Sequence, residues 1–268
     1  MSKMVGEPAV RYEGSATGVA VLTFNRPDRL NAWAADIAAD FYRHIDHAEA
    51  DPDVRVVVIT GAGRGFCAGA HMGSLDRLGE LDGDVDVSAV VGDRPPHFLL
   101  ELRKPVIAAI NGACVGIGLT HALMCDVRFA AAGAKFAAPY ARRGLIAEHG
   151  ISWILARLAG PGVARELLLS GRTFPAEEAQ RLGLVTEVVA ADELLPRALR
   201  YAEDLAANCS PASHRVIKGQ LAADVDSDVA SATERAEKAM AESLTRPDVI
   251  EGITAFLAKR TPEFPPLS

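Results

Sequence analysis

The chain has 268 residues, of which 49% are apolar and 24% are charged, and its formal net charge is -7. This length and composition fit a globular protein with one large core and exclude a disordered chain. The negative charge and the lack of a Lys/Arg cluster exclude a nucleic-acid partner that would be bound through its phosphates.

The first eight residues are polar, and no apolar run in the sequence is long enough to span a bilayer. We therefore expect a cytoplasmic protein with no membrane partner. The cysteines form no Cys-x-x-Cys pair and have no histidine at metal-binding spacing, so we expect buried, reduced thiols and no metal site. They are Cys67, Cys114, Cys125 and Cys209.

Strand and helix patterns alternate along the first part of the chain. Residues 18–24 are apolar and β-branched, which predicts a strand, and apolar residues four apart predict a helix over residues 33–50. Residues 54–60 are almost continuously apolar, as in a strand covered on both faces. Regular patterning then lapses over residues 74–96, and a segment of this length is usually a lid or a mobile loop.

Further elements follow in the same order, and the composition becomes helical after residue 192. We expect a strand-helix core over residues 1–190 and a helical region over residues 191–268. The last two predicted helices have no sheet to pack on, which favours an oligomer. The predicted strands cover residues 105–110, 127–131 and 185–189, and the predicted helices cover residues 98–102, 161–169, 175–182, 230–244 and 247–259.

Two glycine-rich segments, residues 61–72 and 111–126, each follow a predicted strand and lead into a helical pattern. Glycine allows sharp turns and close approach to the main chain. The first N–H groups of a helix have no internal partner and attract negative charge. The two loops are therefore candidates for sharing one developing oxyanion.

Four ordered motifs resemble those of the crotonase superfamily, the enoyl-CoA hydratase/isomerase group, over roughly residues 10–260. They are Asn25-Arg-Pro-Asp-Arg-Leu-Asn-Ala32, Gly63-Arg-Gly-Phe-Cys-Ala-Gly-Ala70, Lys104-Pro-Val-Ile-Ala-Ala-Ile-Asn-Gly112 and Cys125-Asp126. The resemblance implies an α/β fold, a spiral of ββα units with a helical C-terminal region used in trimerisation. It also implies a homotrimer or homohexamer, an acyl-CoA substrate, and no cofactor other than the coenzyme A of that thioester.

The resemblance places the two oxyanion-hole N–H groups on Ala70 and Ile117. Removal of an α-proton from a thioester puts charge on the carbonyl oxygen, and each preorganised donor is worth roughly 3 kcal/mol toward that enolate. Tight turns without a catalytic role are the alternative for both loops. Ile117 replaces a more usual glycine, and its bulk would narrow the pocket.

Both glutamates that hydratases of this superfamily use are missing from the matching positions. Thr120 stands at the first, within Gly116-Ile-Gly-Leu-Thr120, and Tyr140 stands at the second, after Pro139. A threonine hydroxyl and an unperturbed phenol, with a pKa near ~10, are poor general bases at neutral pH. Hydration by the usual carboxylate pair is therefore not expected.

Glu148 matches the acidic position that isomerases of the superfamily carry in a Gly-Leu-x-x-Asp/Glu-x-Gly segment, here residues 144–150. One carboxylate suffices to move a double bond, because it can take a proton from one carbon and return it to another. The alternative is a solvated loop acid or a helix cap. His149 is next to Glu148 and could tune its pKa, although adjacent loop side chains commonly diverge.

The remaining residues are assigned to substrate binding by the same resemblance. Arg29 matches a basic position near the coenzyme A phosphates, with a surface role as the alternative, and His71 replaces a common aspartate, with a hydrogen-bonded structural histidine as the alternative. The assigned set is Arg29, Ala32, Ala68, His71, Met72, Gly116, Thr120, Pro139, Tyr140 and Leu145.

Other enzyme classes fit less well. Phe66 occupies the third glycine position of a dinucleotide-binding fingerprint, and no Gly-x-Ser-x-Gly element is present. Two rivals within the fold remain: a weak hydratase in which Glu148 alone activates water, and an acyl-CoA-binding protein without catalysis. We expect an enoyl-CoA isomerase that uses Glu148 as its proton shuttle.

Overall fold

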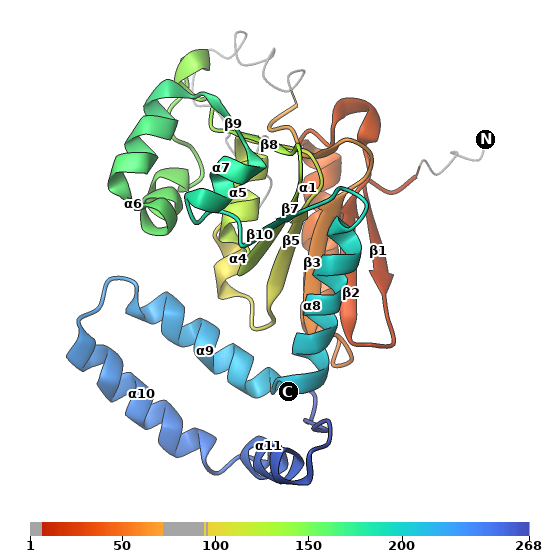
Figure 1. The fold of residues 1–268 in the computed structure, drawn as a ribbon, viewed down its shortest axis with the longest axis vertical. Coiled ribbons are helices and arrows are strands. Elements are labelled where there is room, and N and C mark those ends of the chain that lie inside the picture. The colour runs from red at the N-terminus through yellow and green to blue at the C-terminus, as the bar shows by residue number, and fades with distance from the viewer. Residues whose placement is uncertain (1–6, 72–93, 95, 268) are drawn as a thin grey trace.

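A computed structural model describes residues 7–71, 94 and 96–267 (Figure 1). In this part of the chain, a six-stranded sheet has the order β1-β2-β3-β5-β7-β10, with β1 antiparallel to β2 and the other pairs parallel. Its strands are β1 (Val10–Gly14), β2 (Val19–Phe24), β3 (Val56–Gly61), β5 (Val106–Ile110), β7 (Val127–Ala131) and β10 (Glu187–Val189).

A second sheet of four short strands, in the order β4-β6-β8-β9, lies beside the first within the described residues. Each of β4, β6 and β8 follows shortly after a strand of the large sheet, so each repeat contributes one strand to each sheet. The second-sheet strands are β4 (Gly65–Cys67), β6 (Ala113–Val115), β8 (Lys135–Ala137) and β9 (Thr173–Pro175).

Helices cover both faces of the large sheet. The helix α1 (Ala35–Ala50) buries Ile37, Phe41 and Ile45 in the main core. The helix α8 (Leu194–Asn208) packs its alanine-rich face on the other side, against β3 and β5. This double cover explains why β3 is apolar along its length rather than alternating.

Further helices connect strands of the two sheets. They are α4 (Phe98–Glu101), α5 (Ile117–Met124), α6 (Ile151–Ser170) and α7 (Ala176–Arg181), with 3-10 turns at Pro27–Arg29 and Ala141–Arg143. The helix α6 is interrupted at Gly160, where φ is +82°, so the helix predicted over residues 161–169 is its second half.

The last three helices, α9 (Pro211–Asp224), α10 (Val229–Ser243) and α11 (Pro247–Ala258), extend away from the sheets (Figure 1). Lys218 of α9 pairs with Asp126, which also accepts a 2.7 Å hydrogen bond from the N–H of Val106. The Asp126 carboxylate therefore joins α9 to the core.

The predicted α/β class and alternation are confirmed, but β1 and the strands of the second sheet were not predicted. Strands of three residues are too short to show a period of two. Cys67, Cys114 and Cys125 are buried as expected, whereas the expectation was wrong for Cys209, which is half-buried at the end of α8. The proposed boundary at residue 190 stays a prediction, and most of the segment expected to form a lid lies outside the described residues.

Among the helices that the structure describes, none combines the length and the apolar character needed to cross a bilayer.

Candidate active site

The two glycine-rich loops meet at Gly69 and Gly116. Gly69 has φ of +97°, and a Cβ added there would lie 3.3 Å from the carbonyl oxygen of Val115. A Cβ on Gly116, where φ is +54°, would lie 3.8 Å from the Cα of Gly69. Glycine fits both positions because each has a positive φ, and at Gly69 a side chain would also crowd the Val115 carbonyl.

Two asparagines from the sequence motifs hold the start of the first loop. The Asn31 side chain donates to the carbonyl oxygens of Gly65 and Ala62 at 2.7 and 3.0 Å. The Asn111 side chain donates to that of Gly63 at 2.9 Å. These bonds satisfy loop carbonyls that would otherwise be left without partners in a partly buried turn.

Trp33 holds the end of the same loop. Its N–H donates to the carbonyl of Gly69 at 2.7 Å, and its own carbonyl accepts the N–H of His71 at 2.8 Å. Hydrogen-bonding groups alternate in direction along an extended chain, so the N–H of Ala70 points away from Trp33. Within residues 7–71, 94 and 96–267, no acceptor takes that N–H.

The second loop presents the N–H of Ile117, the first residue of α5. This N–H also has no acceptor in the described part of the chain, as is usual for the first turn of a helix. The next residue, Gly118, packs against Cys67 of β4 so closely that a Cβ would collide with it. The start of α5 is thereby held against the strand that leads to Ala70.

Thr120 and Tyr140, at the two positions where hydratases carry glutamate, are both buried here. The Thr120 hydroxyl donates to the Gly116 carbonyl at 3.3 Å. The Tyr140 hydroxyl lies 3.9 Å from the Cβ position of Gly116 and has no hydrogen-bond partner among the described residues. Burial raises the pKa of this phenol to about 12; the nearby Thr120 hydroxyl lowers it, and the charge of Glu148 raises it. Tyr140 is therefore a protonated donor at neutral pH and not a base.

Glu148 lies near this group, as its effect on the pKa of Tyr140 indicates. Its side chain is 33% exposed, and partial burial raises the pKa of the carboxyl group above its ordinary value. A carboxylate in such surroundings is a stronger base than a fully solvated one.

The His149 and Glu148 side chains do not diverge but lie close together. His149 has a left-handed backbone, with φ of +57°, and its Nε2 lies 3.5 Å from Oε2 of Glu148. Burial lowers the pKa of His149, so the imidazole is neutral at neutral pH. The sequence shows that the two residues are adjacent but not that their side chains meet.

His121 is buried one residue beyond Thr120, stacked on Trp33 with ring centroids 4.2 Å apart. Its Nδ1 is 2.9 Å from the carbonyl of Ile117. Burial lowers its pKa to about 4, the hydrogen bond to Ile117 raises it, and the charge of His149 lowers it. Trp33 is bonded to the first loop and His121 to the second, so the stacked rings connect the two loops. The sequence patterns did not indicate this role.

The Arg29 side chain forms an ion pair within the protein. Its guanidinium donates to both carboxylate oxygens of Asp36, at 2.8 and 2.9 Å, and Arg26 binds the same carboxylate at 3.0 Å. Burial acts to raise the pKa of Asp36, but the charge of Arg29 and the hydrogen bonds from Ile37, Arg29 and Arg26 lower it overall. A role toward coenzyme A phosphates stays a prediction.

The other predicted binding residues that the structure describes lie on the two glycine loops, beside the first loop or next to Tyr140. The N–H of Ala68 donates to Leu30 at 3.1 Å, which places Ala68 alongside the segment that contains buried Ala32. The N–H of Leu145 donates to the Tyr140 carbonyl at 3.0 Å, and Pro139 packs near Gly171. His71 is half-buried at the end of the first loop. Met72 lies outside the described residues.

Comparison with known proteins bears on the fold and the family. Residues 14–266 match the family model described as enoyl-CoA hydratase/isomerase. The 1,2-epoxyphenylacetyl-CoA isomerase of Escherichia coli is 36% identical over 251 residues, which cover 92% of this chain and 95% of that protein. The short-chain-enoyl-CoA hydratase of Clostridium acetobutylicum is 33% identical over 243 residues, 90% of this chain and 92% of that protein.

Solved structures of similar proteins agree with this match. An enoyl-CoA hydratase, EchA12_1, from Mycobacterium marinum is 63% identical, with a TM-score of 0.69 over 80% of this chain and 97% of that one. A probable enoyl-CoA hydratase/isomerase from Mycobacterium abscessus is 33% identical, with a TM-score of 0.87 over 96% of this chain and 99% of that one. The expected crotonase-type α/β fold is confirmed.

Proposed function

We propose that this chain, a member of the enoyl-CoA hydratase/isomerase family, moves the double bond of an enoyl-CoA thioester from the β,γ to the α,β position. The observation that carries this proposal is the make-up of the site beside the glycine loops. It contains Glu148 as a carboxylate, and hydroxyl groups stand at both positions of the hydratase pair.

Ala70 and Ile117 would bind the thioester oxygen through their backbone N–H groups. Both groups lack an acceptor in the described part of the chain, and the loops that carry them are in contact. Such donors stabilise negative charge most effectively when they are fixed in place before the reaction starts. The packing of Gly69 on Val115 and of Gly118 on Cys67 would provide this rigidity.

Glu148 would carry the proton. Its carboxylate removes a proton from the α-carbon, and the C–H electron pair moves onto the thioester to give the enolate. The protonated Glu148 then delivers the proton to the γ-carbon, and the new double bond forms between the α- and β-carbons. The raised pKa of Glu148 favours this exchange, because the same group must accept a proton and release it.

Hydration is the second candidate, because several similar proteins are named enoyl-CoA hydratases. In that reaction Glu148 would activate water, and the Thr120 and Tyr140 hydroxyls would orient it. Hydroxyl groups with a high pKa cannot replace the missing second carboxylate as a base, so we expect slow hydration. Binding of acyl-CoA without turnover is the third candidate.

We propose that the acyl-CoA substrate contacts the predicted set around Arg29, Ala68 and Tyr140. We also propose that the enzyme acts in the cytoplasm as a homotrimer or homohexamer.

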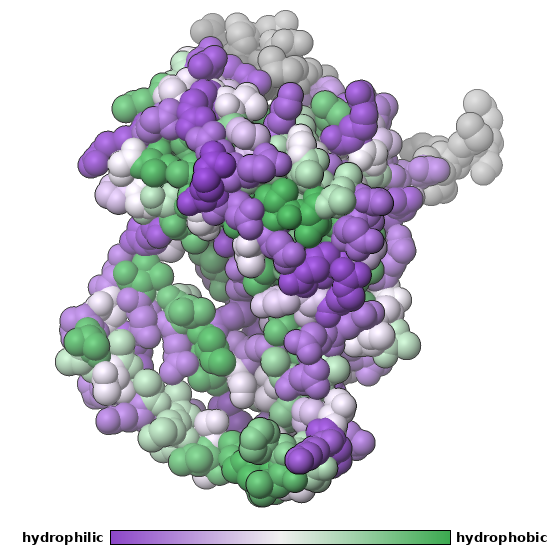
Figure 2. Space-filling view, in the orientation of Figure 1, coloured by the Kyte–Doolittle hydropathy of each residue, from purple (hydrophilic) through white to green (hydrophobic). Residues whose placement is uncertain are grey.

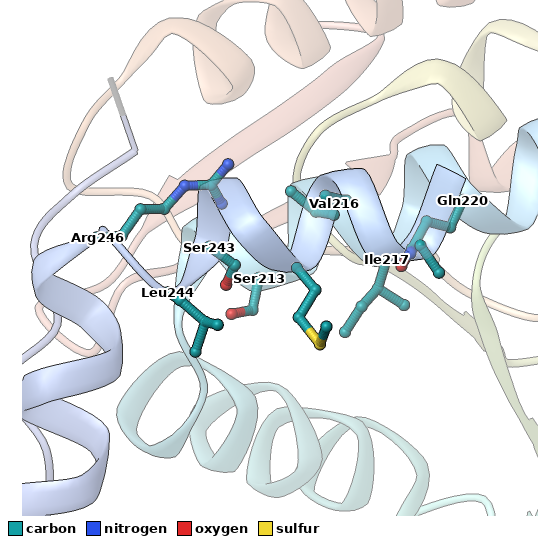
Figure 3. Close-up of a pocket in the computed structure, with 10 residues that line it drawn as sticks. Ser213, Val216, Ile217, Gln220, Ser243, Leu244 and Arg246 are labelled. Atoms are coloured by element: carbon teal, nitrogen blue, oxygen red, sulfur yellow. The ribbon is translucent and has the colours of Figure 1, made fainter. Parts of the chain in front are cut away.

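The last helices carry exposed apolar side chains, which are prominent over α9 and α11 in Figure 2. A cavity of about 280 Å³ lies between α9 and α10 and is lined by Ile217, Met240 and Leu244, among others (Figure 3). A second copy of the chain would cover this surface. Sedimentation of the wild type and a Leu244→Asp variant tests the assembly.

Assays with β,γ- and α,β-unsaturated acyl-CoA esters separate the three candidates. The isomerase proposal predicts conversion of the β,γ ester, slow or absent hydration of the α,β ester, and loss of conversion in Glu148→Ala. Faster hydration than isomerisation would favour the hydratase. Tight binding of both esters without turnover would favour the binding protein.

A further inference from the structure

His149 and Glu148 form a close pair whose geometry the backbone imposes. His149 and Gly150 both have left-handed backbones, with φ of +57° and +75°, immediately before α6. This conformation is unfavourable for a residue with a Cβ, so the surrounding structure must hold it. With the chain turned in this way, Nε2 of His149 lies 3.5 Å from Oε2 of Glu148.

The surroundings of His149 favour a neutral ring. Its side chain is only 12% exposed, and burial lowers its pKa. Among the described residues, the titratable groups that face it are Glu148, the preceding residue, and His121 of α5, while Tyr140 interacts with the same Glu148. His121 and Tyr140 are buried and uncharged at neutral pH, so neither stabilises a charged imidazole.

A neutral imidazole carries one N–H, which can donate to a carboxylate. The separation of 3.5 Å is at the outer limit of a hydrogen bond. Catalytic hydrogen bonds are often this long in unliganded proteins and shorten when the substrate binds. The contact can therefore become a hydrogen bond after a small rotation of either side chain.

We infer that His149 is a positioning residue, whose Nε2–H donates to Glu148 and fixes the orientation of the carboxylate toward the substrate. The inference rests on the proposed function, since it assigns His149 a role in the proton transfer by Glu148. A hydrogen bond to a carboxylate stabilises its ionised form, so loss of this donor would raise the pKa of Glu148. One oxygen of Glu148 then accepts the hydrogen bond from His149, and the other is free to accept the proton from the α-carbon of the substrate.

The test uses His149→Phe, which keeps a ring but removes the donor, and His149→Gln, whose amide nitrogen can replace Nε2. We expect His149→Phe to lower kcat by ~10-fold or more with KM within about twofold, since the loss concerns the transition state. Its acid limb of kcat/KM should move to higher pH, because the ionised Glu148 has lost a donor. His149→Gln should restore both values most of the way.

His97→Phe is the matched control. His97, the residue before α4, lies 3.7 Å from Glu101 at the end of that helix, and both side chains are mostly exposed. This variant should leave kcat and the pH profile unchanged. Thermal unfolding of each variant checks the fold, and His149→Leu replaces His149→Phe, with the same expected result, if the latter does not fold.

Two further variants separate this inference from the proposed function. In the background of Glu148→Gln, His149→Phe should cause no further loss, because the residue acts through Glu148. If Glu148→Gln retains full isomerisation, both proposals are overturned. If Glu148→Gln is inactive while His149→Phe keeps the wild-type kcat and acid limb, the role of His149 alone is overturned.

Discussion

Gly69 lies so close to Val115 that a side chain at position 69 would approach the Val115 carbonyl oxygen to 3.3 Å. The contact joins the two glycine-rich loops directly, one residue before Ala70 and two residues before Ile117 along their respective loops. The distance between the two proposed oxyanion donors therefore depends on this backbone contact.

A Gly69→Ala variant should separate the loops. The position has φ of +97°, so alanine adds backbone strain as well as the contact with Val115. We expect a loss of about 1–3 kcal/mol in the free energy of unfolding and a fall of about 100-fold in kcat/KM. Chemical denaturation and steady-state kinetics measure the two effects.

Gly219→Ala is the control for that substitution. A Cβ at Gly219, within α9, would meet no atom within 4 Å among the described residues. Alanine should stabilise this helix by about 0.5–1 kcal/mol without changing activity. Equal losses of activity in both variants would contradict the role of the loop contact.

Tyr140→Phe should retain most of the isomerase activity. The Tyr140 hydroxyl is buried without a partner in the described part of the chain, and the proposed reaction does not use it as a base. Its removal should raise the free energy of unfolding by about 1 kcal/mol, because an unsatisfied buried hydroxyl is costly. Tyr12→Phe removes a similar orphan hydroxyl from β1 and should stabilise without any effect on activity. A loss of 100-fold or more in Tyr140→Phe would show that the phenol takes part in the chemistry.

His121 should make the protein less stable in acid. Burial lowers its pKa to about 4 in the folded protein, so the unfolded chain binds a proton below the ordinary pKa of 6.5 while the folded chain does not. The stabilisation is fully present above pH 6.5 and is lost as the pH falls toward 4, by on the order of 3 kcal/mol. Unfolding curves of His121→Phe should depend less on pH over this range. An unchanged slope in His121→Phe would contradict the account.

Lys218→Met should loosen the last three helices. Lys218 is 9% exposed and pairs with Asp126, which would be left with the Val106 N–H but without its cation. We expect a loss of about 2 kcal/mol and faster proteolysis between α8 and α9. Arg200→Met removes the exposed pair with Glu193, at 3.5 Å, and should cost less than ~1 kcal/mol. Equal protease resistance in both variants would contradict the role of Asp126 as an anchor.

Elements with a clear period or a long apolar run could be predicted from the sequence. The strand β3 is such a case, because burial on both faces requires a continuous apolar run. The helix α1 is another, because burial of one face requires apolar residues at helical spacing. The strands of the second sheet could not be predicted, since three residues carry no period. Their positions are fixed by pairing with distant strands, as in the alignment of Cys67 with Cys114.

The same distinction, between features with a local sequence pattern and features fixed by three-dimensional contacts, applies to the candidate site. The turns of the glycine loops could be predicted, because glycine and a helix start are local features, whereas their role toward negative charge stays a prediction. The contact between Glu148 and His149 depends on a left-handed histidine, and the pairing of Arg29 with Asp36 depends on the start of α1 folding back over the turn before it. The spacing of residues in the sequence indicates neither of these two contacts.

Transfer of an isotopic label tests the central claim most directly. A β,γ-enoyl-CoA that carries deuterium on its α-carbon is converted by the enzyme, and the product is examined by NMR. A single carboxylate that moves the proton predicts deuterium on the γ-carbon of the α,β product, and no such product from Glu148→Gln. Isomerisation that proceeds unchanged in Glu148→Gln would contradict the account.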